Sequence, residues 1–153
     1  MSEDGSFWDT LEPRYRVILC DVWGVIHNGK QIYHGADRRL LRWREEGRFV
    51  VLITNAPRPS HAVESVLQRV GLPSDAWDAI ATSGEAGIAA LSGLACPVGF
   101  MGTPADLSDF HEAGIRIAEG DDFTDLCCTG FLEHQWEIED YTADLERWAA
   151  RGV

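Results

Sequence analysis

Apolar residues along the chain form short, nearly continuous runs that alternate with amphipathic segments. The run at 16–23 predicts a strand that is buried on both faces of a sheet, and the run at 48–54 predicts a second strand of the buried type. The runs at 97–101 and 126–129 also predict strands. Another short apolar stretch begins at Ile80. Buried strands separated by helices are typical of an α/β fold in which most strands run parallel.

The segments between these runs have the spacing of helices that bury one side. The clearest one begins at Ser60 and stops at Gly71, a common residue after the end of a helix. Its apolar positions recur at helical intervals at Val63, Val66, Leu67 and Val70. Two further helices are predicted over 37–46 and 138–148.

Two more helices are predicted from their first turns. Thr82 and Glu85 are spaced as a capping box, in which the threonine hydroxyl accepts a hydrogen bond from the backbone three residues later. Thr103 followed by Pro104 has the residue types preferred at the cap and first position of a helix. The whole chain therefore reads as alternating strands and helices.

Charge is unevenly distributed. The 153 residues have a formal net charge of -12, and residues 1–70 carry ten bases and nine acids, whereas 71–153 carry three bases and sixteen acids. This shift suggests two units with different surfaces. The acidity argues against nucleic-acid or anionic membrane partners. The acidic first residues do not resemble a targeting peptide, and no apolar run is long enough to span a membrane, so we expect a cytoplasmic protein.

Polar residues follow the first two strands, where each strand ends. Asp21 is a carboxylate at the end of an apolar run, which is the edge at which open α/β sheets bind ligands. Thr54 and Asn55 follow the second strand, ahead of a helix N-terminus that suits an anion such as phosphate. Capping and turn formation explain each of these residues equally well when taken alone. Together, a carboxylate and a phosphate cradle at one edge indicate phosphoryl transfer.

The sequence also resembles a known family, the haloacid dehalogenase superfamily. Residues 18–25, Ile-Leu-Cys-Asp-Val-Trp-Gly-Val, are similar to its motif I, an Asp-x-Asp-Gly after an apolar strand, and residues 52–55, Leu-Ile-Thr-Asn, to its motif II. The spacing of the later motifs resembles the type IIA branch, which includes nitrophenylphosphatase-like and sugar-phosphate phosphatase-like members. These motifs are Gly29, Gly35-Ala36, Gly71-Leu72-Pro73 and Thr82-Ser83.

The resemblance implies a Rossmann-like parallel-sheet core with an inserted α/β cap. Residues 1–81 would form the first half of the core, and residues 82–153 would form part of the cap. We therefore expect the chain to be an N-terminal fragment of a longer hydrolase. A half-built core should leave apolar sheet edges exposed, so we expect marginal stability or homo-oligomer formation.

The resemblance also implies roles for individual residues. Asp21 would attack the phosphoryl group of a small phosphorylated substrate and form an aspartyl-phosphate. Mg²⁺ would be held by the Asp21 carboxylate and the backbone carbonyl of Trp23. Thr54 would bind the phosphoryl oxygens, and Asn55 would brace the loop or touch substrate. Arg58 would contact the substrate or the cap, although a solvated arginine is the alternative.

Two departures from the family pattern limit the expected activity. Trp23 occupies the place of the general acid/base aspartate, and an indole cannot supply that proton transfer, which typically contributes a factor of roughly 10²–10⁴ in rate. The later lysine and the acidic metal-binding pair of the family are also missing, because Lys30 and Asp121-Asp122 lie in the wrong places. We therefore expect negligible phosphatase activity from these 153 residues alone.

Two alternatives stay open at this point. The chain could be a non-catalytic phospho-ligand-binding or regulatory protein on the same scaffold, with Trp23 as the mark of lost chemistry. A phospho-accepting receiver domain is disfavoured, because it needs an acidic pair before the accepting aspartate and a lysine on a later strand. His27 is a candidate for proton transfer near Asp21, but we expect it to be a turn residue exposed to solvent.

Overall fold

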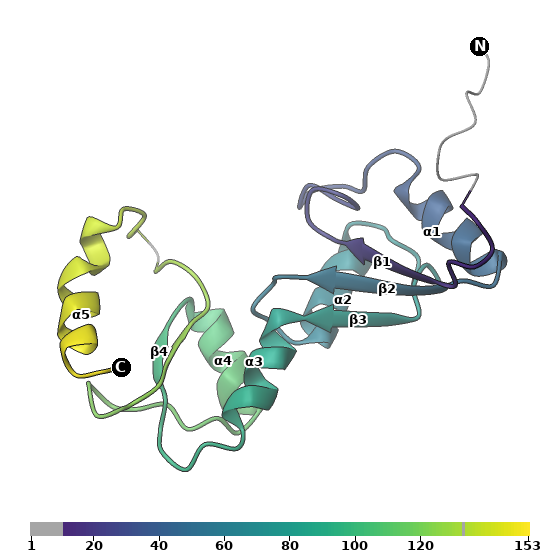
Figure 1. The fold of residues 1–153 in the computed structure, drawn as a ribbon. Coiled ribbons are helices and arrows are strands. Elements are labelled where there is room, and N and C mark those ends of the chain that lie inside the picture. The colour runs from purple at the N-terminus through teal and green to yellow at the C-terminus, as the bar shows by residue number, and fades with distance from the viewer. Residues whose placement is uncertain (1–10, 133) are drawn as a thin grey trace. The chain divides into compact units, whose positions relative to one another are not determined.

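The computed structural model describes residues 11–132 and 134–153, which alternate between strands and helices along the chain. Ten elements are labelled in chain order (Figure 1). They are β1 (Val17–Asp21), α1 (Ala36–Glu45), β2 (Phe49–Thr54), α2 (Ser60–Arg69), β3 (Ala79–Thr82), α3 (Ser83–Leu91), β4 (Gly99–Met101), α4 (Pro104–Glu112), β5 (Leu126–Cys128) and α5 (Glu139–Ala150). The predicted α/β class and the type of every predicted element are confirmed.

The chain divides into two compact units that are not continuous in sequence. The first unit comprises residues 1–54 and 63–81, and the second comprises residues 55–62 and 82–153. The short segment that follows β2 is therefore grouped with the second unit. The assignment of the two halves of the chain to a core and a cap stays a prediction.

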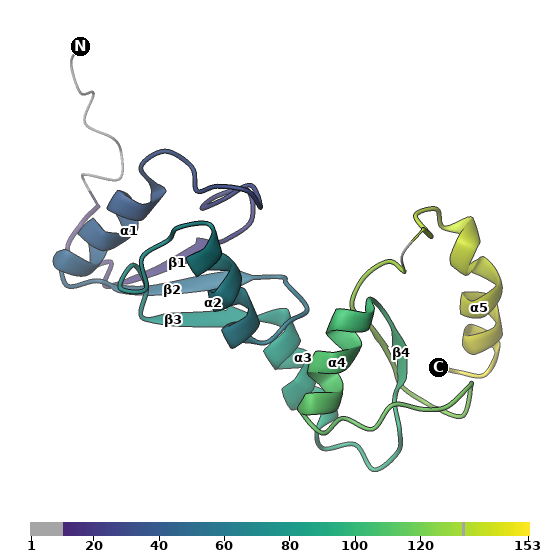
Figure 2. The ribbon, with the colours of Figure 1, turned by 180° about the vertical axis from the view of Figure 1, so that it is seen from behind.

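The first unit contains a three-stranded sheet in the order β1-β2-β3. β1 and β2 are parallel, and their register runs from Val17 opposite Phe49 to Asp21 opposite Ile53. The three arrows in Figure 1 point the same way. Right-handed crossovers between parallel strands in this order place α1 and α2 on the same face of the sheet. Figure 2 shows α2 in front of the sheet, on the face hidden in Figure 1.

The two faces of this sheet are buried to very different extents. On the helix-covered face, Val50 and Leu52 are completely buried, as is Leu67 of α2. The opposite face is exposed, and its large apolar side chains are Val17, Leu19, Phe49 and Ile53. The prediction that the first strand is buried on both faces is therefore wrong, because no helix among the described residues of the first unit covers this side. β1 is also an edge strand.

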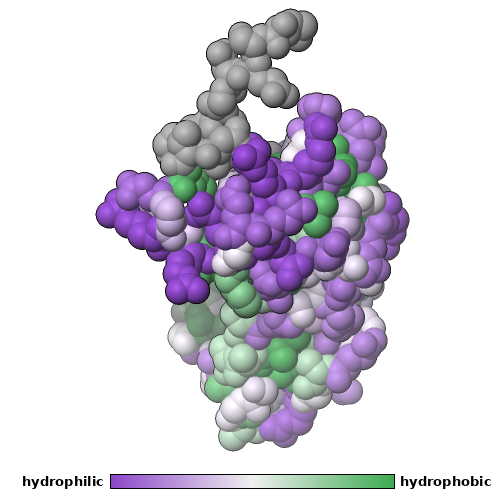
Figure 3. Space-filling model, turned by 90° about the vertical axis from the view of Figure 1, so that its right-hand side faces the viewer, coloured by the Kyte–Doolittle hydropathy of each residue, from purple (hydrophilic) through white to green (hydrophobic). Residues whose placement is uncertain are grey.

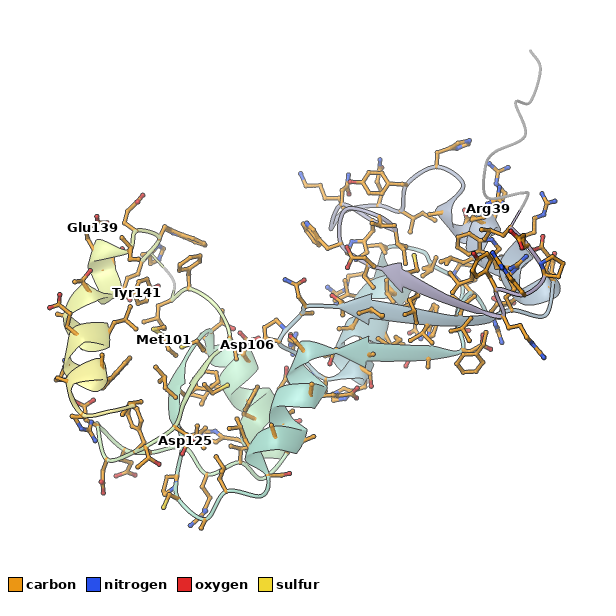
Figure 4. The ribbon with its side chains drawn as sticks, in the orientation of Figure 1. Arg39, Met101, Asp106, Asp125, Glu139 and Tyr141 are labelled. Atoms are coloured by element: carbon orange, nitrogen blue, oxygen red, sulfur yellow. The ribbon has the colours of Figure 1, made fainter. Side chains whose placement is uncertain are left out.

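The second unit is built on the parallel strand pair β4-β5 and has its own core. Phe110 of α4 packs there with Val98 and Ile115. The predicted N-caps are confirmed, since the backbone N–H of Glu85 donates to the Thr82 hydroxyl at 3.0 Å, but the capping box is not completed, because the Glu85 carboxylate binds Ser60 instead. An equivalent bond links Asp106 and Thr103 at 3.2 Å (Figure 4 labels Asp106). These side chains satisfy N–H groups that a helix N-terminus otherwise leaves unpaired.

The surface drawn in Figure 3 is mainly hydrophilic, with smaller apolar areas between the polar side chains. Within the described residues, no helix is both long enough and apolar enough to cross a bilayer. The cytoplasmic location stays a prediction.

Candidate functional site

The candidate site lies where β1 and β2 end. Asp21 is the last residue of β1 and pairs in register with Ile53, so the next residue, Thr54, lies at the same edge of the sheet. Thr54 is buried, whereas Asp21 is exposed. The two residues that the sequence singled out are therefore brought to one sheet edge by a five-pair parallel register.

Asp21 is among the residues that line an apolar pocket of about 560 Å³, which runs along β1. The pocket walls include Ile26, Leu40 and Trp43. No described residue donates a hydrogen bond to the Asp21 side chain or forms an ion pair with it. Burial, and secondarily the nearby Asp21 charge, raise the pKa of the Cys20 thiol to about 11. Cys20 is thus a neutral thiol at pH 7.

The loop after β1 folds back on itself and carries Trp23 on its outside. The Val22 carbonyl accepts a hydrogen bond from the Ile26 N–H at 2.9 Å. Trp23 is 62% exposed as a residue, but its ring covers Gly29, where an added Cβ would lie 2.6 Å from the indole. Gly29 has a φ of 85°, a conformation that glycine adopts without strain. Trp23 therefore acts as a packing residue of this loop.

His27 is buried, so the expectation of a solvent-exposed turn histidine is wrong. Its Nδ1 accepts a hydrogen bond from the Gly29 N–H at 2.8 Å, and its ring meets the Trp23 ring edge-on at 5.4 Å between centroids. Burial lowers the pKa of His27. The imidazole is therefore neutral at pH 7, with its proton on Nε2. The turn spacing did not predict that a tryptophan would cover this ring.

The donor atoms around Asp21 fit part of a magnesium site. Mg²⁺ prefers oxygen ligands and usually keeps several waters, with one or two carboxylates from the protein. Asp21 offers a carboxylate, and no described residue donates a hydrogen bond to the Trp23 backbone carbonyl. The described residues contain no cluster of three or more acidic, histidine or cysteine ligands. These two oxygens therefore fit a hydrated, incompletely ligated cation.

Asn55 and Arg58 follow Thr54 in the chain but are grouped with the second unit. The Arg58 guanidinium donates from Nε and Nη2 to the two carboxylate oxygens of Asp109, at 2.6 and 3.1 Å. The Asp109 side chain is only 7% exposed. This hydrogen bond, together with the charges of nearby acids, raises the pKa of Arg58 although burial opposes it. Arg58 is thus held by a buried carboxylate of α4.

Sequence comparison identifies the family. The family model for haloacid dehalogenase-like hydrolases matches residues 18–116, which is more than half of the chain. The chain belongs to the haloacid dehalogenase-like hydrolase family. A search of curated proteins found no significant match.

Solved structures of this family have the same fold. A haloacid dehalogenase-like hydrolase from Brucella suis 1330 is 31% identical with a TM-score of 0.86, and the match covers 94% of this chain and 56% of that one. NagD from E. coli is 21% identical, with a TM-score of 0.64 and coverages of 90% and 54%. A 4-nitrophenylphosphatase from Thermotoga maritima is 19% identical, with a TM-score of 0.65 and coverages of 88% and 52%. The chain spans about half the length of these relatives.

The sequence did not predict the side chains that hold the loop after Thr54. Asp109 lies 51 residues from Arg58, and Glu85 lies 25 residues from the Ser60 backbone that it binds. Local spacing identified Glu85 only as part of a helix cap. A pairing over this distance leaves no periodic signal in a single sequence.

Proposed function

We propose that this haloacid dehalogenase-like chain contributes the nucleophile and part of the phosphate site of a Mg²⁺-dependent phosphatase that acts on a small phosphorylated metabolite. The observation that carries the proposal is the register of β1 and β2, with Asp21 and Thr54 at one edge. The exposed Asp21 carboxylate has no competing partner among the described residues, so its oxygen is available to attack phosphorus.

In the proposed reaction, a carboxylate oxygen of Asp21 forms a bond to phosphorus while the bond to the leaving group breaks. Water then hydrolyses the resulting acyl phosphate, which releases phosphate and restores the carboxylate. The Thr54 hydroxyl and the Asn55 loop would bind the phosphoryl oxygens, with Arg58 at the edge of this loop. Bound Mg²⁺, held by Asp21 and the Trp23 carbonyl, would offset negative charge on the phosphate.

The names of the structural relatives support the phosphatase class. They include the 4-nitrophenylphosphatase and a glycerol phosphate phosphatase from Mycobacterium tuberculosis in complex with magnesium, which is 22% identical with a TM-score of 0.65. That match covers 91% of this chain and 42% of the relative. At such identities these relatives support the fold, and the substrate class is our proposal.

Trp23 restricts which reactions the site could support. An indole N–H is too weak an acid to protonate a leaving alkoxide, so substrates with good leaving groups, such as acyl and aryl phosphates, are favoured. For the same reason, and because the chain lacks the other charged motifs of the family, we expect negligible turnover from the 153 residues by themselves.

A second candidate function is phospho-ligand binding without catalysis. The packing of the Trp23 ring on Gly29 and His27 favours this alternative, because it gives the tryptophan a structural reason to occupy the position of the catalytic acid. Both candidates predict that this chain binds phosphate, and both predict negligible turnover from these residues alone, so only turnover above background would distinguish them.

Phosphate binding tests the proposal directly. Isothermal titration calorimetry of the chain with inorganic phosphate, with and without Mg²⁺, should detect phosphate binding. Mg²⁺ should raise the affinity. Asp21→Asn should remove the Mg²⁺ effect, whereas Asp122→Asn, at another exposed aspartate, should retain it. Wild-type chain that does not bind phosphate in the presence of Mg²⁺ would refute the proposal.

Turnover of 4-nitrophenyl phosphate would exclude the binding-only candidate. The expected result is no release of phosphate above background. Release that Asp21→Asn abolishes would contradict the expected inactivity of the chain and exclude the binding-only alternative.

A further inference from the structure

The loop that follows Thr54 is held by the first turn of α3. The Ser83 hydroxyl lies 2.8 Å from the Asn55 carbonyl oxygen and 3.0 Å from that of Ala56. The Gly84 N–H donates to the same Ala56 carbonyl at 3.1 Å. Two consecutive carbonyls of the loop are therefore fixed by residues 27 to 28 positions later in the chain.

Gly84 allows this close approach because it has no side chain. A Cβ at position 84 would lie 2.5 Å from the Arg58 nitrogen and 2.5 Å from the Pro57 carbonyl carbon. These are backbone atoms, which cannot move aside as a flexible side chain can. The loop backbone is thus packed directly against the start of α3, and its path depends on this glycine.

Glu85 connects the starts of α3 and α2. Its own N–H is bonded to Thr82, while its carboxylate accepts hydrogen bonds from the Ser60 N–H at 3.2 Å and from the Ser60 hydroxyl. A carboxylate at a helix N-terminus is favoured by the helix dipole. Glu85 therefore fixes the far end of the loop, at the point where α2 begins.

The third attachment is the ion pair of Arg58 with Asp109 of α4. Its two hydrogen bonds have the parallel geometry of a bidentate arginine–carboxylate pair, which fixes orientation as well as distance. The pairing uses Nε and Nη2, and no described residue accepts a hydrogen bond from Nη1. Asp109 thus sets the direction in which the remaining edge of the guanidinium faces.

We infer that Ser83, Glu85 and Asp109 are positioning residues for phosphate binding. They hold the segment 55–60 at three places along its length, through the carbonyls of 55 and 56, the Arg58 side chain and Ser60, so that Asn55 and the free edge of Arg58 are presented in one arrangement to an anion. This inference rests on the proposed function, because the anion is the phosphate group of that site. The three residues belong to α3 and α4, which are grouped in the same unit as the loop that they hold.

Phosphate affinity and amide exchange in matched variants test this inference. Ser83→Ala should weaken Mg²⁺-dependent binding of inorganic phosphate by about three- to tenfold, the range expected for losing one neutral hydrogen bond, here shared between two carbonyls. Ser83→Thr keeps the hydroxyl and should restore the affinity. Ser108→Ala, at an exposed serine of α4, should leave it unchanged.

The ion pair is tested in the same way. Asp109→Asn should weaken phosphate binding, whereas Asp144→Asn, which alters an exposed pair with Arg147, should not. Hydrogen exchange followed by NMR should show faster exchange at the Gly84 N–H in Ser83→Ala and at the loop amides in Asp109→Asn. This exchange measurement needs no ligand.

The outcomes separate the two proposals. Faster exchange without any phosphate binding by the wild-type chain would overturn the proposed function and with it the positioning role. Phosphate binding that Ser83→Ala and Asp109→Asn leave unchanged would overturn the positioning role alone. Loss of affinity in Ser83→Ala that Ser83→Thr does not restore would also count against it, since the effect would then not follow the hydroxyl.

Discussion

The exposed face of the first sheet predicts that the isolated chain self-associates through β1. Parallel sheets are normally covered on both faces, and an unpaired edge strand with apolar side chains is a template for pairing with another copy. Leu19 lies at the centre of this strand and is 65% exposed. Leu19→Lys places a charge at the centre of the surface and should shift the chain toward the monomer.

The size of the effect follows from the exposed area. Complete burial of a leucine side chain contributes roughly 1.5–3 kcal/mol, so covering the exposed two thirds of Leu19 contributes about 1–2 kcal/mol. In a two-fold contact each copy supplies this residue to the interface, which doubles the contribution to about 2–4 kcal/mol. Loss of both contacts should therefore weaken association by about 30- to 1,000-fold.

Sedimentation velocity over a range of chain concentrations measures this change. Tyr33→Lys is the matched control, because it adds the same charge at an exposed apolar residue of the first unit that does not line the pocket along β1. A wild-type chain that stays monomeric at all concentrations would refute the reasoning. Equal dissociation of both variants would show that added charge, and not the β1 surface, controls association.

Three further predictions concern stability and reactivity. Phe110→Ala should lower the free energy of unfolding by about 3–5 kcal/mol in urea titrations, because this ring is 1% exposed in the core of the second unit; a loss below about 1 kcal/mol would contradict that packing. Hydrogen bonds from Arg44 and the Val50 N–H lower the pKa of Asp78 in the folded chain. The contribution of Asp78 to stability is therefore complete above its unfolded pKa near 3.8, and it is lost as the pH falls through its lower folded pKa. Unfolding followed between pH 5 and 2 should therefore be less acid-sensitive in Asp78→Asn than in wild type, and equal sensitivity would exclude this role. Cys20, with a pKa of about 11, should react slowly with iodoacetamide at pH 8 and faster as the pH rises toward 11, as mass spectrometry of the alkylated peptides would measure; rapid alkylation at pH 8 would be inconsistent with that pKa.

Most of the secondary structure could be predicted from the sequence because its signals are local. The helix that begins at Ser60 was given by apolar spacing, and the caps at Thr82 and Thr103 by residue type. The burial of β1 could not be predicted in this way. A continuous apolar run identifies a strand, but whether both of its faces are covered depends on which elements lie beside it in space.

The candidate site was predictable to the same extent. Asp21 and Thr54 each follow a strand, and parallel pairing brings them to one edge without any further information. The network around Arg58 was not predictable, because each of its bonds joins residues that are distant in sequence. The burial of His27 was likewise not predictable. It depends on the Trp23 ring, which packs against His27 and over Gly29, where there is no side chain in the way.

The repeated passage of the chain between its two units has a consequence for dissecting the protein. Cleavage between residues 81 and 82 would leave segment 55–62 covalently joined to the first piece. The groups that bind this segment, which belong to residues 83–85 and Asp109, would be on the second piece. The carbonyls of Asn55 and Ala56 and the Arg58 side chain would then lose these hydrogen-bond partners. A chimera that exchanges the acidic half of this chain for that of a relative must therefore carry segment 55–62 along with it.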